Sequence, residues 1–289
     1  MRTLRTDLAL ERRSFLGSRL PEGIGFEETQ RDGVTLTKID VFSKEAAAAL
    51  GKPEGTYYTA AMEGFPGSDA LTDDRLAVLT EALDALLPEQ GGVLVVGLGN
   101  PAVTPDALGP KCAAMVLATR HIDRATMEEL SLPPLREVSV LSPGVTGQTG
   151  FEAAEIIAGI VQKVKPACVI AVDALAAAGV ERLARTVQLS SAGIEPGSGV
   201  GNARKALNRE TLGVPVVSVG VPTVVDALSL AKDVFDATEA PDADADIARM
   251  MVTPRDIDTV IDGAARLLAL SVNCALQKNL SPAQLMGLM

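Results

Sequence analysis

The chain has 289 residues, 47% of them hydrophobic, which is enough for one large buried core and excludes a disordered chain. The formal net charge of -11 argues against nucleic-acid binding by general attraction, because such binding relies on Lys and Arg neutralising phosphates. Residues 1–19 are locally basic but lack the continuous apolar stretch of a signal peptide, and no run approaches a membrane span. We therefore expect a cytoplasmic protein that binds neither nucleic acid nor membrane.

Taken in chain order, apolar strand-like segments alternate with stretches of helical periodicity. The strand-like segments are 34–41, 93–98, 137–141, 168–173, 187–190 and 214–221. One helical face repeats leucines between residues 76 and 86, and a second face lies between residues 257 and 268. This alternation predicts an α/β fold with a mostly parallel central sheet flanked by helices. Residues 233–246 contain six acids and no Lys or Arg, which is typical of a solvated loop.

Cysteine and histidine limit the chemistry. Cys112, Cys168 and Cys274 are far apart without C-x-x-C spacing, so we expect buried thiols and neither a disulfide framework nor a metal site. His121 is the only histidine, so any Ser-His-Asp or Cys-His mechanism would have to use it. We expect it at the end of the helix that begins after Thr104, where a histidine is also favourable for dipole reasons alone.

Two aspartates follow apolar strands of the predicted sheet. Asp106 comes after segment 93–98 and its GLGN turn, and Asp173 ends segment 168–173. Ligands bind at the carboxyl ends of parallel strands, so we expect the two acids to share one site. Asp106 also fits the first turn of a helix, where an aspartate contributes about 0.3 to 1 kcal/mol without any catalytic role. Asp173 is harder to explain structurally, because a buried charge must be paired, solvated or bound.

A carboxylate pair is the chemistry that the remaining motifs leave open. The loop at residues 97–103 begins like a dinucleotide fingerprint but has Val103 near the third glycine position, and the chain has neither a P-loop nor a nucleophile elbow. In a partly dry site two acids do not both ionise easily, so one can hold a proton while the other activates water. Such a pair hydrolyses amides without metal or cofactor, and we predict neither.

Taken together, ordered blocks along the chain resemble the germination protease family of spore-forming bacteria, endopeptidases that degrade small acid-soluble spore proteins. The matching blocks are residues 5–9, 97–100, 103–110, 119–121, 143–145, 173–176, 193–194, 196–202, 220–226 and 252–254. The resemblance implies an atypical aspartic endopeptidase of the spore core, a homotetramer with a fold similar to hydrogenase-maturation proteases (phosphorylase/hydrolase-like). Its substrates would be small acid-soluble spore proteins.

The same resemblance implies roles for individual residues. Asp106 and Asp173 match the essential acids. The family's self-processing zymogen implies a propeptide of residues 1–7, cleavage of the Asp7–Leu8 bond, and a single α/β peptidase domain over residues 8–289. Thr6-Asp7-Leu8-Ala9 with Glu11 looks like the family's substrate pattern of Thr, acid, apolar residue and Ala with a later Glu. Further candidates for substrate binding are Gly97, Asn100, Gly147, Gly199, Asn202 and His121.

Three other functions remain open on sequence grounds. A peptidyl-tRNA hydrolase-like esterase also carries GLGNP and TRH motifs, although here 17 residues separate Pro101 from Thr119 and the chain is acidic. A metal-dependent maturation peptidase would use acids and His121 as ligands. A small-molecule-binding module would use the glycine-rich loops at the strand ends.

Overall fold

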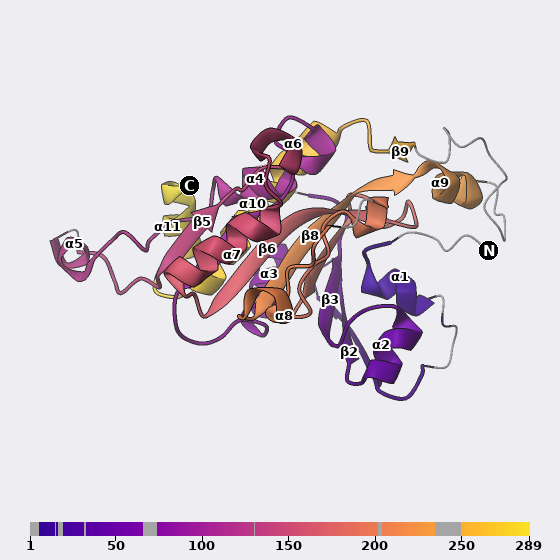
Figure 1. The fold of residues 1–289 in the computed structure, drawn as a ribbon, viewed down its shortest axis with the longest axis horizontal. Coiled ribbons are helices and arrows are strands. Elements are labelled where there is room, and N and C mark those ends of the chain that lie inside the picture. The colour runs from indigo at the N-terminus through magenta and orange to yellow at the C-terminus, as the bar shows by residue number, and fades with distance from the viewer. Residues whose placement is uncertain are drawn as a thin grey trace.

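The computed structural model describes residues 6–14, 16, 20–31, 33–65, 74–129, 131–201, 204–234 and 250–289. In these residues one sheet has the strand order β1-β2-β3-β7-β8-β6-β4-β5, and β9 pairs with β8 (Figure 1). The strands are β1 Ile24–Arg31, β2 Val34–Val41, β3 Gly55–Ala61, β4 Val93–Gly97, β5 Val138–Leu141, β6 Cys168–Ala177, β7 Thr186–Ser190, β8 Val216–Asp226 and β9 Met251–Val252.

The helices lie between and after these strands, as the alternating pattern predicts. The α-helices are α1 Ala9–Ser14, α2 Lys44–Leu50, α3 Asp74–Asp84, α4 Leu108–Ala113, α5 Arg124–Glu129, α6 Thr146–Thr149, α7 Ala153–Val164, α8 Arg209–Leu212, α9 Ala227–Val234, α10 Ile257–Leu276 and α11 Pro282–Leu288. The described residues also include two short 3-10 helices in loops, η2 Thr104–Asp106 and η3 Ser198–Val200. The predicted α/β fold is confirmed.

The sheet is mixed and not mostly parallel as predicted, because its two halves differ in strand pairing. Strands β8, β6, β4 and β5 are parallel, with Gly97 of β4 opposite Val172 of β6. Strands β1, β2, β3 and β7 are antiparallel to their neighbours, and β7 joins the halves by pairing antiparallel with β8. The sequence reading missed β1 and β3, because their polar and small residues lack the continuous apolar runs of the parallel half.

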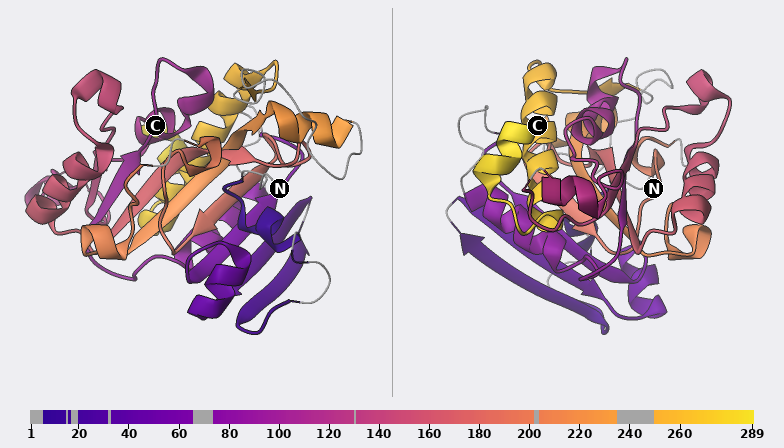
Figure 2. Two further views of the ribbon diagram at one scale, coloured as in Figure 1. Left: turned by 45° about the vertical axis from the view of Figure 1, so that its right-hand side comes forward. Right: turned by 90° about the vertical axis from the view of Figure 1, so that its left-hand side faces the viewer.

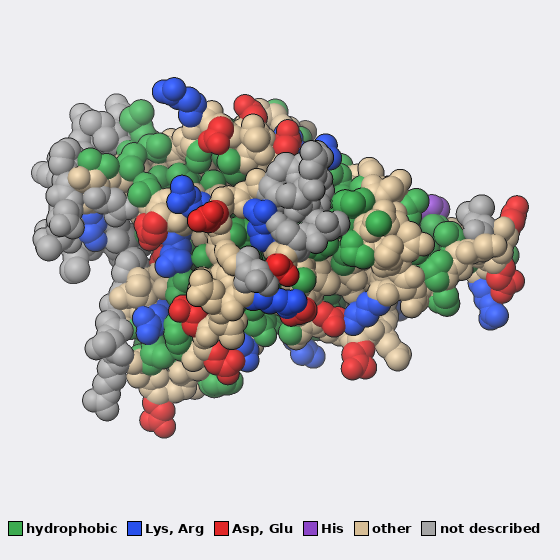
Figure 3. All heavy atoms as spheres, turned by 180° about the vertical axis from the view of Figure 1, so that it is seen from behind, with side chains coloured by type: hydrophobic (Ala, Val, Ile, Leu, Met, Phe, Trp, Pro, Cys, Tyr) green, Lys and Arg blue, Asp and Glu red, His purple; other side chains and the backbone are tan. Residues whose placement is uncertain are grey.

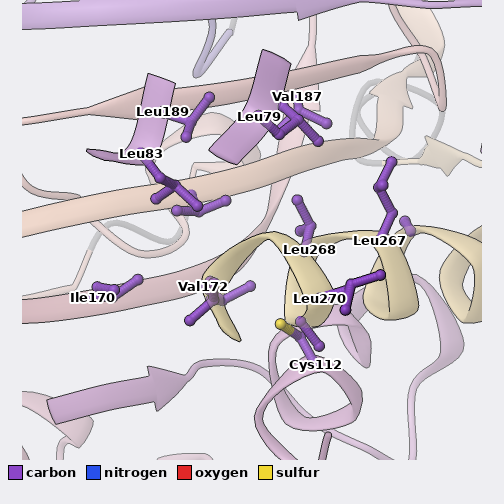
Figure 4. Close-up of a cluster of buried hydrophobic side chains, with 14 of the residues drawn as sticks. Leu79, Leu83, Cys112, Ile170, Val172, Val187, Leu189, Leu267, Leu268 and Leu270 are labelled. Atoms are coloured by element: carbon purple, nitrogen blue, oxygen red, sulfur yellow. The ribbon is translucent and has the colours of Figure 1, made fainter. Parts of the chain in front are cut away.

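Helices cover both faces of the parallel half (Figure 2). On one face α3, α4 and α10 bury their apolar sides against the sheet, and Figure 4 shows Leu79, Leu83 and Leu268 beside Val172 and Val187. On the other face α7 and α8 pack on alternate residues of β4, β6 and β8. Side chains of a strand point alternately to the two faces, so neighbouring residues of β6 belong to different cores.

Three sequence predictions differ from the structure. Strand β6 continues to Ala177, so Asp173 lies within the strand, because pairing with β8 overrides the helical propensity of the alanines. Asp106 lies in η2, before α4 begins at Leu108. Helix α4 ends at Ala113, and His121 lies in an exposed turn. Thr253 donates its hydroxyl to the Thr223 carbonyl at 2.8 Å, and α10 begins at Ile257.

Two further features concern the C-terminal third of the chain. Most of the predicted acidic loop lies outside the described residues, which omit 235–249. Helix α10 is long and apolar enough to cross a membrane by composition, but 72% of its most apolar window is buried inside the protein. It packs against α3 and α4, as expected of the central core helix of this face.

Candidate active site

The register between β4 and β6 brings the loop after β4 next to Asp173. Because the strands are parallel and adjacent, the Leu98 N–H donates to the Val172 carbonyl at 2.8 Å, one residue before Asp173. Val169 and Ala171 pack under α7, so strand alternation puts Asp173 on that same face. Leu175 and Ala177 follow on this face and form a small apolar cluster beyond the helix.

Asp106 is held by contacts on both sides of η2. Its Oδ2 accepts a hydrogen bond from the Asn100 N–H at 2.8 Å, so its carboxylate faces back toward the loop after β4. The Thr223 hydroxyl of β8 donates to the Pro105 carbonyl at 2.7 Å, which fixes η2 over the sheet. Burial raises the pKa of Asp106, although the Asn100 N–H and the nearby Arg204 oppose that rise.

Asp173 is the more deeply buried acid, with 5% of its surface exposed. Its pKa is raised well above the ordinary value, first by burial and then by repulsion from the charges of Asp106 and Asp7. The Ala174 N–H, at 2.9 Å from its Oδ1, and Arg204 oppose the rise. Asp106 and Asp173 line the same cavity of about 390 Å³. The structure therefore brings Asp106 and Asp173 to one cavity.

A third acid, Asp7, enters this site from the N-terminal segment, which we define as residues 6–11. The Asp7 N–H donates to the Ala176 carbonyl at 2.9 Å, and its Oδ2 accepts from the Ala176 N–H at 2.8 Å. Its Oδ1 accepts from the Ser198 hydroxyl at 2.8 Å. Asp7 and Asp173 line both the first cavity and a second one of about 210 Å³. The N-terminal segment thus crosses the cleft beside the acid pair.

The residues after Asp7 contact the end of β6 and the residues that follow it. Leu8 is fully buried against Leu175 and Ala177. The Glu11 carboxylate accepts from the Ala178 N–H at 2.8 Å and the Gly179 N–H at 2.9 Å, and it also accepts from the Thr6 hydroxyl. Burial raises the pKa of Glu11 despite these donors. Asp7, Leu8 and Glu11 thus each contact a different group of the cleft.

Two side chains that sequence reasoning missed contact the Asp7 carbonyl oxygen. Lys52 Nζ donates to it at 2.8 Å, and Gln188 Nε2 donates at 2.9 Å. Lys52 lies between α2 and β3. Its position gives no sequence signal for function, because lysines are common near the C-terminal ends of helices. Gln188 lies in β7 between the fully buried Val187 and Leu189. A polar residue inside so short an apolar strand was the one available signal, because buried polar groups need partners.

Comparison with known proteins identifies the family. The sequence profile of the germination protease family matches residues 8–238. The chain is also 38% identical to the germination protease of Clostridium perfringens, with 97% of each chain covered. The chain belongs to the germination protease family. This membership favours a peptidase over the tRNA esterase and the small-molecule-binding module.

Other germination proteases show the same similarity. That of Caldanaerobacter subterraneus subsp. tengcongensis is 38% identical over 96% of this chain and 95% of its own. That of Bacillus cytotoxicus is 43% identical over 81% of this chain and 66% of its own. Among solved structures, the [NiFe] hydrogenase maturation protease HycI from Thermococcus kodakarensis covers 66% of this chain and 98% of its own, at 18% identity and a TM-score of 0.37.

Some of the remaining candidate residues lie at the site, and others have no contact with it. Asn100 holds Asp106, and Gly199 lies against Asp7, where a Cβ would be 2.1 Å from Asp7 Oδ2. Gly97 has a packing role, because a Cβ there would be 2.2 Å from the Gly109 carbonyl oxygen of α4. Gly147 is exposed in α6 with open space around it.

Two candidates do not belong to the described cleft. Asn202 lies outside the described residues. His121 is exposed and lines neither cavity; as the only histidine it is the purple side chain in Figure 3. On the face in Figure 3 acidic and basic side chains are interspersed. In the described part of the chain, no group of three or more His, Cys, Asp or Glu side chains has the geometry to hold a metal ion.

Proposed function

We propose that this chain is an atypical aspartic endopeptidase that starts the degradation of small acid-soluble spore proteins, and that it first cleaves its own Asp7–Leu8 bond. The observation that carries the proposal is the N-terminal segment, whose Asp7 lies in the cleft beside Asp106 and Asp173. Residues 1–7 are the propeptide of this proposed zymogen, and residues 8–289 are the peptidase domain. The family resemblance supports a homotetramer in the spore core.

The two acids have complementary protonation states in this proposal. Burial and the neighbouring charges of Asp106 and Asp7 favour a proton on Asp173, whereas the Asn100 N–H and Arg204 favour a charged Asp106. Asp106 accepts a proton from water as the water oxygen attacks the Asp7 carbonyl carbon. Asp173 gives its proton to the Leu8 nitrogen as the C–N bond breaks. The products are a carboxyl group on Asp7 and an amine on Leu8, and the pair still holds one proton.

The contacts of the segment also support the proposed substrate pattern. The acid before the cleaved bond contacts Ser198 and the Ala176 N–H, and the apolar residue after it enters the cluster with Leu175. The later Glu11 contacts two backbone N–H groups, Ala178 and Gly179. A spore-protein segment with the same residues in the same order would make these contacts once residues 1–7 have left the cleft.

The acid pair is tested by removing one carboxylate at a time. We expect Asp106→Asn and Asp173→Asn to abolish both self-cleavage at Asp7–Leu8 and digestion of a spore-protein peptide, because an amide can neither activate water nor supply the proton. The measurements are the mass of the purified chain over time and the release of peptide fragments. Asp258→Asn, on the exposed first turn of α10, is the matched control and should behave like wild type. Wild-type cleavage by either cleft variant would refute the pair.

A further inference from the structure

The carbonyl of the Asp7–Leu8 bond already has two side-chain donors, which line the second cavity and not the one that Asp106 lines. Its oxygen accepts from Lys52 Nζ at 2.8 Å and from Gln188 Nε2 at 2.9 Å. We propose that Lys52 and Gln188 are further catalytic residues that form an oxyanion site and stabilise the negative charge that develops on this oxygen during cleavage. The inference rests on the proposed function, because it assigns a role at the bond that the acid pair would cut.

The fold explains why these two side chains reach one atom. Val187 and Leu189 point into the core under α3 and α10, so strand alternation turns Gln188 to the opposite face, where the N-terminal segment lies. Helix α2 ends at Leu50, and the left-handed backbone of its cap Gly51 (φ 69°) turns the chain toward β3. Lys52 follows this turn, and both residues line the second cavity with Asp7 and Asp173.

A second hydrogen bond fixes the orientation of the Gln188 amide. Its Oε1 accepts from the Ala9 N–H at 2.6 Å, so the Nε2 end must face the Asp7 carbonyl. One side chain therefore contacts the backbone on both sides of Leu8. This contact holds the bond in place before reaction, and a preorganised donor needs no reorientation as charge develops.

The charge of Lys52 is effective at this position because it is partly removed from water. Burial lowers the pKa of Lys52, and the nearby Arg12 lowers it further, whereas Asp7, Glu195 and Glu11 favour its charged form. An ammonium that contacts a neutral carbonyl leaves part of its charge unbalanced. A developing oxyanion balances that charge, so the contact strengthens between the bound segment and the transition state.

The step can be written with its atoms balanced. The water oxygen bonds to the Asp7 carbon, one water proton goes to Asp106, and the carbonyl electron pair moves onto the oxygen held by Lys52 and Gln188. When the C–N bond breaks, this electron pair returns to form the new carboxyl group, and the proton of Asp173 goes to the Leu8 nitrogen. Lys52 keeps all its protons, so Asp173 need not protonate the carbonyl oxygen.

The experiment measures self-processing of the full chain as the first-order appearance of an N-terminal Leu8 by mass spectrometry. Lys52→Met keeps the apolar stem and removes the charge, and we expect its rate to fall about 100- to 1,000-fold. Gln188→Glu keeps the acceptor for Ala9 and removes the donor, with a fall of at least about 10-fold expected. Lys52→Arg keeps a charged donor and should cleave faster than Lys52→Met.

Controls separate this role from folding and from substrate binding. Lys44→Met, at the exposed start of α2, should process at the wild-type rate, and the thermal midpoint of each variant is measured alongside. After prolonged incubation the processed variants are assayed on a spore-protein peptide, where kcat should fall far more than KM rises. A wild-type rate for Lys52→Met, a change in KM alone, or equal rates for Lys52→Met and Lys52→Arg would overturn the inference.

Comparing Asp106→Asn with Lys52→Met separates the oxyanion site from the acid pair. If Asp106→Asn stops cleavage while Lys52→Met cleaves like wild type, only the oxyanion site is wrong. If Asp106→Asn itself cleaves at Asp7–Leu8 like wild type, the acid pair is wrong, and with it the reaction that the oxyanion site would serve.

Discussion

The two halves of the sheet contribute different groups to the cleft. The parallel half supplies Asp106 and Asp173, whose burial raises the pKa of both carboxyl groups. The antiparallel half supplies Gln188 from β7 and Lys52 from the turn before β3, and both are hydrogen-bond donors. The bond between Asp7 and Leu8 lies where the halves meet. In the proposed mechanism, the acids that would act on water are thus separated from the donors that hold the carbonyl.

This separation has a physical basis in strand pairing. Parallel strands end at one edge, so they gather loop residues such as Asp106 around a buried neighbour. An antiparallel strand can present a side chain from its middle, and Gln188 reaches the cleft from there because alternate residues of β7 change face. Neither half alone would surround the peptide bond. The joining strand pair, β7 with β8, is therefore the structural requirement for the proposed site.

Beyond the acid and donor substitutions described above, the largest effect is expected where the loop after β7 contacts the segment. In Gly199→Ala the added Cβ would be 2.1 Å from Asp7 Oδ2 and 2.8 Å from the Ala176 Cβ, so the segment must shift out of position. We expect the rate of self-processing to fall by at least about 100-fold, because displacement by about 1 Å has that cost. Gly147→Ala, with open space around it, is the matched control. Equal rates for the two variants would show that Asp7 does not react from this position.

A smaller effect is expected from pH, which acts on the parallel half. The raised pKa of Asp173 means that its proton is kept at mildly acidic pH and lost as the pH rises, whereas Asp106 loses its charge at lower pH. The self-processing rate should therefore rise from neutral to mildly acidic pH and then fall again, changing about 10-fold per pH unit on each limb. Time courses of Leu8 formation in a buffer series give the profile. A flat profile from acid to neutral pH would contradict the shared proton.

The smallest expected effect is on stability, and it also concerns Asp173. A carboxyl group with a raised pKa in the folded state contributes stability below its ordinary pKa of 3.8, and that contribution is lost as pH rises through the folded value. At neutral pH, intact Asp173→Asn should therefore unfold at a higher temperature than intact wild type, by about 2 to 4 °C for each kcal/mol relieved.

This stability difference has an internal control. It should disappear below the ordinary pKa of aspartate, where both chains carry a neutral group at this position. Thermal scans at both pH values, with chain masses checked for processing, make the comparison. A lower thermal midpoint for Asp173→Asn than for wild type at neutral pH would contradict this prediction. It would mean that the wild-type carboxyl group stabilises the folded protein at that pH.

Much of the parallel half could be predicted from sequence. The leucine repeat at residues 76–86 became α3, the periodicity at 257–268 became the start of α10, and the apolar runs became β4, β6 and β8. These predictions succeed because a strand or helix buried in a large core carries a long apolar signal. The antiparallel strands β1 and β3 were missed, because partly exposed strands contain polar residues that hide the pattern.

The sequence by itself was enough to predict the α/β class, to select Asp106 and Asp173 as candidates and to show the family resemblance. Apolar runs and motifs can be recognised from residues that are close together in the chain. Only the tertiary structure decided that Asp7 lies beside Asp173, and that Lys52 and Gln188 meet at one carbonyl oxygen. Gln188 is 181 residues from Asp7 along the chain, and such a contact depends on strand order and on the face to which each side chain points. Neither property can be recognised from a short stretch of sequence.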